Sequence, residues 1–321
     1  MEKFDRDQAL RLATQIFTKA RLAGVLDKWN GRKGGFILVF HEISEAQLAK
    51  HLTQLSRSYT FVSLSEFTGR LADGKSTSGL AVITFDDGYG AVIESAARLA
   101  RLHGWPMTFF LPTRYLDTRE PNWYQELGPL LQRATRERLT LNGLNLSLHD
   151  PASRATALNT LDRRFKSLTS IEEINNLLRK LRYALLGSEE QPADLLMSEP
   201  ISWERVRELS TREELSFEAH SVNHLALSRL SEKEVREEME RCLTRIEEVT
   251  GRKVQHFCYP YGDPCDIGEL APRLARSLFR SATTMLRGRC RRNSDLALLP
   301  RIPLYERDSE QMVAFKVCLA S

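Results

Sequence analysis

The 321-residue sequence contains no apolar run long enough to cross a bilayer, and it shows no internal repeats or low-complexity segments. Its opening stretch, MEKFDRDQALRLATQIFTKARLAG, carries charges throughout and lacks the apolar centre of a signal peptide. With 42% hydrophobic and 27% charged residues, the composition is that of an ordinary globular protein. We therefore expect a cytoplasmic protein, built as one large domain or as a domain with a sizeable insertion.

Paired cysteines and a strong excess of one charge are also missing. The five cysteines lack zinc-finger spacing, and in a reducing compartment we interpret them as thiols. Lys+Arg exceed Asp+Glu by only 46 to 42 and aromatic residues are sparse, so we expect no nucleic-acid partner. One basic run at 276–292 contains six arginines and could attract an anionic polymer, a lipid-linked phosphate or a membrane surface. The sequence does not indicate the oligomeric state.

Apolar runs typical of strands alternate with helical patterns along most of the chain, which predicts parallel strands joined by helical crossovers. One predicted helix ends at Gly104, and another begins with a Ser231–Glu234 capping box and ends at Gly251. The strand candidates number about seven or eight, which is enough to close a (β/α) barrel. They lie at 36–40, 60–64, 81–85, 107–111, 215–219, 254–259, 280–285 and 298–304.

The alternation breaks between about 115 and 199. There, LTLNGLNLSL predicts a hairpin across an Asn-Gly turn, and SIEEINNLLRKLRYALLG predicts an amphipathic helix with a Ser170–Glu173 capping box. We interpret this stretch as an insertion over one end of the barrel. The predicted organisation is an N-terminal helical segment at 1–33, a barrel formed by 34–114 and 200–307, a mainly helical insertion at 115–199, and a C-terminal segment at 308–321.

Two adjacent carboxylates follow one of the predicted strands. Asp86 and Asp87 come directly after the apolar run at 81–85, and Gly88 follows them. The carboxyl ends of parallel strands meet on the face where ligands bind. Two like charges at that face repel each other unless they share a cation or a proton. The alternative is an ordinary Asx turn in which one aspartate caps the next helix.

Two histidines follow another predicted strand. His220 and His224 are four residues apart in EAHSVNH, and we expect one helical turn to bring both imidazoles to the same face. One carboxylate and two histidines form the donor set of a catalytic divalent-metal site, with zinc among the favoured ions. Two surface histidines at this spacing also arise by chance, so the Asp pair strengthens the indication.

TFDDGYG, HSVNH and FCYPYG, in this order and spacing, resemble the first three motifs of the polysaccharide deacetylase family, also called carbohydrate esterase family 4 or the NodB-homology domain. The similarity extends from LVFHEI at 38 to LPRIPL at 299. It implies a distorted (β/α)7-8 barrel and metal-dependent removal of acetyl groups from amino sugars.

The resemblance also implies roles for individual residues. Asp87, His220 and His224 would bind the divalent metal, with zinc favoured and cobalt, nickel or manganese as alternatives. Asp86 would be the general base, and the Tyr261 backbone N–H would stabilise the tetrahedral intermediate. The neighbouring Tyr259 and Pro260 would contact substrate, although Tyr-Pro-Tyr-Gly is also an ordinary turn sequence.

Three departures from the family pattern affect the chemistry. Cys258 stands where many members have an arginine that orients the base, and the later motif with a paired acid and tryptophan is absent from 287–300. Arg301 stands where the last motif has a histidine that protonates the leaving amine, and arginine cannot serve as that acid. Arg301 could instead bind Asp86 or a substrate phosphate or carboxylate, and the ordinary alternative is a solvated salt bridge.

His41 is our candidate for the missing acid, because it directly follows the strand at 36–40 and therefore belongs to the same rim as the Asp pair. Its alternative role is to cap the next helix or the strand end. Trp123 and Tyr124 could stack on a sugar or belong to the core. We interpret His51, His103, His149 and His256 as structural or surface residues.

The sequence thus predicts a cytoplasmic, metal-dependent hydrolase that removes an acetyl group from an N-acetylated saccharide in glycan or lipid-linked saccharide synthesis. Two alternatives stay open. One is a non-catalytic carbohydrate-binding protein of the same fold, and the other is a deacylase of a non-sugar amide.

Overall fold

The computed structural model describes residues 34–192 and 198–320. The predicted N-terminal helical segment at 1–33 lies outside the described residues. No helix in the described part is long and apolar enough to span a membrane.

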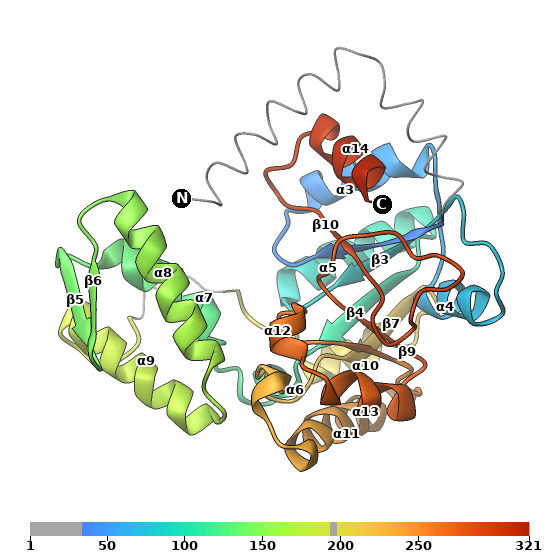
Figure 1. Ribbon diagram of the computed structural model, residues 1–321. Helices are drawn as coiled ribbons and strands as arrows, with labels where there is room; N and C mark the ends of the chain where they lie inside the picture. The colour runs from blue at the N-terminus through green and yellow to red at the C-terminus, as the bar shows by residue number, and fades with distance from the viewer. Residues whose placement is uncertain (1–33, 193–197, 321) are drawn as a thin grey trace.

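A single parallel sheet of eight strands forms the centre of the molecule (Figure 1). Its strand order is β10-β1-β3-β4-β7-β8-β9, with β2 paired to β3, and every pairing is parallel. The strands are β1 (Phe36–Phe40), β2 (Thr60–Phe61), β3 (Leu80–Phe85), β4 (Met107–Leu111), β7 (Leu215–Ala219), β8 (His256–Cys258), β9 (Ser281–Thr283) and β10 (Ile302–Pro303).

The segment at 299–304 connects the two edges of this sheet. Leu299 forms a parallel bridge with Thr283 in β9, and Ile302 pairs with Leu38 in β1. The sheet therefore curls into a distorted barrel, which confirms the predicted fold class. The burial of the β1, β4 and β8 residues from end to end is typical of parallel strands covered on both faces.

Helices cover the outside of the barrel, and sequence signals set several of their ends. They are α3 (Glu45–Ser56), α4 (Leu64–Ala72), α5 (Gly90–His103), α10 (Trp203–Leu209), α11 (Glu232–Thr250), α12 (Pro264–Ile267), α13 (Leu270–Leu278) and α14 (Glu310–Leu319). Helix α5 ends at Gly104 with φ 68°, and α11 has the Ser231–Glu234 capping box and ends at Gly251 with φ 66°, as predicted. The strand predicted at 60–64 is shorter, because Ser63 caps α4 and the helix begins at Leu64.

Between β4 and β7 the chain forms a separate lobe beside the barrel, drawn in green in Figure 1. After α6 (Thr113–Thr118) it contains α7 (Trp123–Arg133), the hairpin β5 (Arg138–Leu141) and β6 (Leu144–Ser147), α8 (Pro151–Lys166) and α9 (Ile171–Leu186). Asn142 and Gly143 both have positive φ, which confirms the predicted Asn-Gly turn. The buried Glu126 of α7 and Arg182 of α9 form an ion pair that joins these helices.

Candidate metal centre

The Asp pair lies where β3 ends inside the barrel. The Asp86 N–H donates to the Phe40 carbonyl at 3.0 Å, which continues the β1–β3 pairing by one residue. Asp87 and Gly88 then adopt φ values of 70° and 73°, so the chain turns sharply. Aspartate tolerates this left-handed conformation better than most residues. Both side chains are almost completely buried, at 4% and 5% exposure.

The loop that carries the two histidines is not helical, so the predicted helical turn is wrong. Ser221 and His224 have φ values of 63° and 52°, and the His224 N–H donates to the Ser221 hydroxyl at 3.0 Å. One carboxylate oxygen of Glu238, on α11, accepts the N–H groups of Val222 and Asn223 at 3.0 and 2.8 Å. These bonds fix a tight loop that still brings both imidazoles together.

Three donor atoms converge at this point. Asp87 Oδ1 lies 3.7 Å from His220 Nε2 and 3.5 Å from His224 Nε2. A tetrahedral zinc ion about 2.0–2.2 Å from each ligand would separate the ligand atoms by about 3.3–3.6 Å. His220 Nδ1 lies 2.7 Å from the Cys258 carbonyl oxygen, which only accepts, so Nδ1 carries the hydrogen and Nε2 is free to coordinate. Burial lowers the pKa of His224 to about 3, which keeps this imidazole neutral. Burial opposes the charged form of His220, but Cys258 and the carboxylates of Asp87 and Asp86 outweigh it and raise the pKa of His220, so a metal ion would replace a proton at its Nε2 atom. The residues present therefore fit a divalent metal ion.

The side chain of Asp86 is held by Arg301, and not by a residue at position 258. The Arg301 Nη1 and Nη2 atoms donate to Asp86 Oδ1 and Oδ2 at 2.8 and 2.7 Å. Arg301 has 0% exposure, so the expected solvated salt bridge is a buried bidentate pair, and its guanidinium does not face a substrate surface. Burial raises the pKa of Asp86, but the charge and hydrogen bonds of Arg301 outweigh it and lower that pKa below the usual value. Asp86 is therefore an ionised carboxylate of fixed orientation.

Arg301 reaches Asp86 because its segment crosses between β9 and β1. Hydrogen bonds hold this segment to the chain on both sides. The Thr284 N–H, next to β9, donates to the Leu299 carbonyl, and the Leu304 N–H donates to the Val39 carbonyl in β1. Cys258, Asp86 and His220 also form a compact group. Arg301 Nη2 lies 3.1 Å from Cys258 Sγ, however, and its positive charge opposes a cation there. The cluster of Asp87, His220 and His224 is the better metal site.

His41 lies beside the same carboxylate. Its Nε2 atom is 3.7 Å from Asp86 Oδ2, and its side chain is 36% exposed. Solvent therefore reaches His41, whereas Asp86, Asp87, His220 and His224 are buried. The structure therefore brings His41 to the candidate site, as its position after β1 predicts.

The turn after β8 lies on the same rim. Tyr261 has a φ of 61°, and among the described residues none accepts a hydrogen bond from its backbone N–H. Pro260 accepts a bond from Gly262 N at 2.7 Å, which tightens the turn. Tyr259 is 1% exposed and donates to the Ala297 carbonyl, so the structure places it in the core and not on a substrate surface.

Other aromatic and histidine side chains divide between core and surface. Trp123 is 4% exposed and stacks on Phe165, so it belongs to the core. The Tyr124 hydroxyl contacts Asp87. The sequence does not predict this contact, because Tyr124 lies in the insertion, which has no fixed spacing from the Asp pair. His256 and His51 are buried and hydrogen-bonded, and His103 and His149 are exposed, which agrees with structural or surface roles.

The role of Glu238 also went unrecognised in the sequence, although a signal for it existed. A glutamate lies within the apolar stripe of α11, between Val235 and Cys242. A charged residue in a buried stripe calls for a polar partner, and here the partner is the histidine loop.

A parallel barrel that holds Asp86 beside a buried cluster of Asp87, His220 and His224 defines an α/β protein with a candidate metal centre. A sequence model of the family described as polysaccharide deacetylase matches residues 73–277, and the chain belongs to that family. No curated protein matches the sequence.

Solved structures share the fold at low sequence identity. The Streptococcus pyogenes deacetylase PplD, in complex with acetate, is 14% identical with a TM-score of 0.58, over 89% of this chain and 98% of that one. IcaB from Ammonifex degensii is 18% identical with a TM-score of 0.56, over 89% and 97%. A de-N-acetylase from Aggregatibacter actinomycetemcomitans is 13% identical with a TM-score of 0.55, over 88% and 99%.

Proposed function

We propose that the protein is a metal-dependent N-deacetylase that removes an acetyl group from an amino sugar in a polysaccharide, oligosaccharide or lipid-linked saccharide. The observation that carries this proposal is the pairing of Asp86 with Arg301 beside the cluster of Asp87, His220 and His224. A binding protein would not need an ionised carboxylate fixed beside the metal ligands. Family membership and the fold shared with known deacetylases support the same reaction class.

Each residue has a defined task in this proposal. A divalent ion held by Asp87, His220 and His224, with zinc favoured, would supply Lewis acidity for the amide carbonyl and for water. Asp86 accepts a proton from the attacking water. The Tyr261 backbone N–H donates to the amide oxygen as that oxygen gains negative charge.

The last step breaks the C–N bond. His41 gives a proton to the leaving nitrogen, so that acetate and a free amine are released. Asp86 has then gained one proton and His41 has lost one. Exchange with solvent, which reaches the partly exposed His41, restores both.

Release of acetate tests the proposal directly. We expect the purified protein to release acetate from at least one member of a panel of N-acetylated saccharides, to lose this activity after chelation, and to regain it with zinc or cobalt. A parallel panel of N-acetylated non-sugar amines separates a sugar deacetylase from a general deacylase. Stoichiometric metal and saccharide binding without release from any substrate would identify a binding protein instead.

His41→Ala tests the assignment of the general acid. We expect kcat to fall by about 10²–10⁴-fold with the metal affinity unchanged, because His41 is the candidate proton donor and is not a metal ligand. His103→Ala, which replaces an exposed histidine on the helix α5, is the matched control and should leave kcat unaltered. An unchanged kcat in His41→Ala would assign the acid to another group.

A further inference from the structure

Tyr124 of the insertion contacts a candidate metal ligand directly. It is the second residue of α7, and its hydroxyl donates to Asp87 Oδ1 at 3.0 Å. This is the same oxygen that faces both imidazole Nε2 atoms. Asn122 Nδ2 donates to the Tyr124 hydroxyl at 2.9 Å. Because an amide NH₂ group only donates, the hydroxyl hydrogen is directed to Asp87.

The start of α7 fixes the position of Tyr124. The Asn122 backbone N–H donates to Gln125 Oε1 at 2.8 Å, which closes the first turn of the helix. Gln125 Nε2 in turn donates to the Tyr115 hydroxyl at 3.1 Å, and Tyr115 lies on α6 next to the barrel. The hydroxyl of Tyr124 is therefore held on Asp87 by bonded neighbours on both sides.

Helix α7 also supports His224. The ring of Tyr124 lies 5.1 Å from the His224 ring. Trp123 Nε1 donates to the Tyr261 hydroxyl at 3.2 Å, and that hydroxyl donates to the His224 carbonyl at 3.1 Å. These bonds steady a residue whose φ of 52° is uncommon for a non-glycine. Two of the three candidate ligands thus depend on the insertion for their surroundings.

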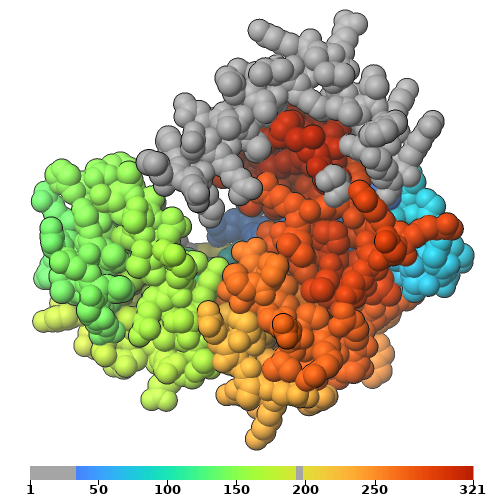
Figure 2. Space-filling model, viewed as in Figure 1, coloured from blue at the N-terminus to red at the C-terminus, as the bar shows by residue number. Residues whose placement is uncertain are grey.

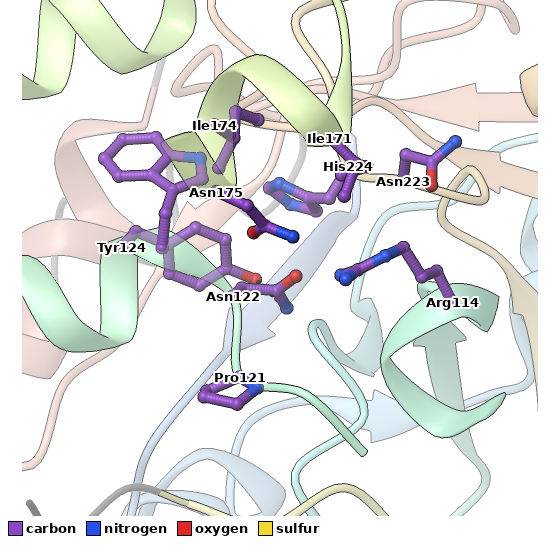
Figure 3. Close-up of a pocket in the computed structure, with 10 residues that line it drawn as sticks. Arg114, Pro121, Asn122, Tyr124, Ile171, Ile174, Asn175, Asn223 and His224 are labelled. Atoms are coloured by element: carbon purple, nitrogen blue, oxygen red, sulfur yellow. Dashed lines mark hydrogen bonds between the residues drawn. The ribbon is translucent and has the colours of Figure 1, made fainter. Parts of the chain in front are cut away.

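The insertion packs closely against this side of the site. The pocket between them, lined by Tyr124, Asn175 and His224, has a volume of about 10 Å³, which is room for roughly one water molecule (Figure 3). Lys166 of α8 lies 4.5 Å from the Tyr261 ring and 3.6 Å from Asp266, and Figure 2 shows the green insertion against the orange surface of that region. A sugar does not fit in this pocket.

We propose that Tyr124 is a positioning residue for the metal centre, through which the insertion completes the outer shell of the site. Its hydroxyl orients Asp87 as a ligand in the way that outer-shell hydrogen bonds orient ligands at metal sites generally. The insertion then contributes to the metal affinity of the site. This inference rests on the proposed metal centre at Asp87, His220 and His224.

Zinc affinity of Tyr124→Phe tests the inference, because this change removes the hydroxyl and keeps the ring. We expect zinc affinity, measured by competition with a chromogenic chelator, to fall by about 10–100-fold. We also expect the cobalt-substituted protein to show an altered visible absorption spectrum, which a purely structural role would not change. Tyr183→Phe, on the exposed face of α9 in the same insertion, is the matched control and should match the unmodified protein in both measurements.

Three outcomes separate the inference from the function on which it rests. Failure of the unmodified protein to bind zinc or cobalt would overturn both. Normal metal binding by the unmodified protein, with Tyr124→Phe within twofold of it and an identical cobalt spectrum, would overturn the inference alone. A loss of zinc affinity in Tyr124→Phe, with apo melting temperatures equal to that of the unmodified protein, supports it.

Discussion

Asp86→Asn should lose about 10³-fold or more of its kcat for acetate release while it binds zinc as the unmodified protein does. The change keeps the shape of the side chain but removes the carboxylate that accepts a proton from water. Asp86 supplies none of the three converging ligand atoms, so the variant should bind as many metal ions per chain as the unmodified protein does. The measurements are initial rates of acetate release and the metal content of the purified variant.

The neighbouring aspartate provides a sharp contrast. Asp87→Asn replaces a candidate ligand, and we expect it to lose both metal and activity. Asp73→Asn, which changes an exposed aspartate at the C-terminal end of α4, should lose neither. Full activity in Asp86→Asn would remove Asp86 as the base, and loss of metal in that variant would show that the two carboxylates do not divide the tasks of base and ligand.

Much of the fold could be predicted from the sequence because its signals are local. The apolar runs specify strands whatever surrounds them, and Ser231, Glu234 and Gly251 specify the two ends of α11 within a few residues of each. The alternation of strands and helices then leaves few arrangements besides a parallel barrel. Strand length was less predictable, as at Ser63, where a capping bond decides against continuing β2.

The candidate site was predictable only in part. The Asp pair and the two histidines could be predicted to meet, because strand ends meet on one face of a barrel. The conformation of the histidine loop could not, because spacing by four suits a helix and a loop equally. Glu238, fourteen residues beyond His224 in sequence, decides in favour of the loop by accepting two of its N–H groups.

Arg301 could be named as one possible partner of Asp86, but spacing could not show that the two form a buried bidentate pair. Arg301 is 215 positions away from Asp86 in sequence, and Cys258 lies between them in the chain. The sequence shows an arginine missing at 258 and an arginine gained at 301 as two separate departures. Segment 299–304 crosses between β9 and β1, and this crossing places Arg301 Nη2 3.1 Å from Cys258 Sγ.

Arg301→Met should therefore remove both stability and activity. It leaves Asp86 as a buried carboxylate without its counter-charge, and breaking a buried pair in this way costs about 3–5 kcal/mol of unfolding free energy. We expect a lower melting temperature and a large loss of kcat. Arg70→Met, which removes an exposed arginine from an i,i+4 pair on α4, should change the unfolding free energy by less than about 1 kcal/mol.

Loss of activity through unfolding must be distinguished from loss of the oriented base, and the double variant Cys258→Arg with Arg301→Met does so. Cys258 Sγ lies 3.5 Å from Asp86 Oδ2, so an arginine placed there can reach the same carboxylate once position 301 is vacated. If Asp86 needs a guanidinium and not Arg301 itself, the double variant should regain stability and part of kcat over Arg301→Met. A double variant as stable as the unmodified protein but still inactive would show that the guanidinium must approach from segment 299–304. Arg301→Met with unaltered stability and kcat would show that the pair serves neither purpose.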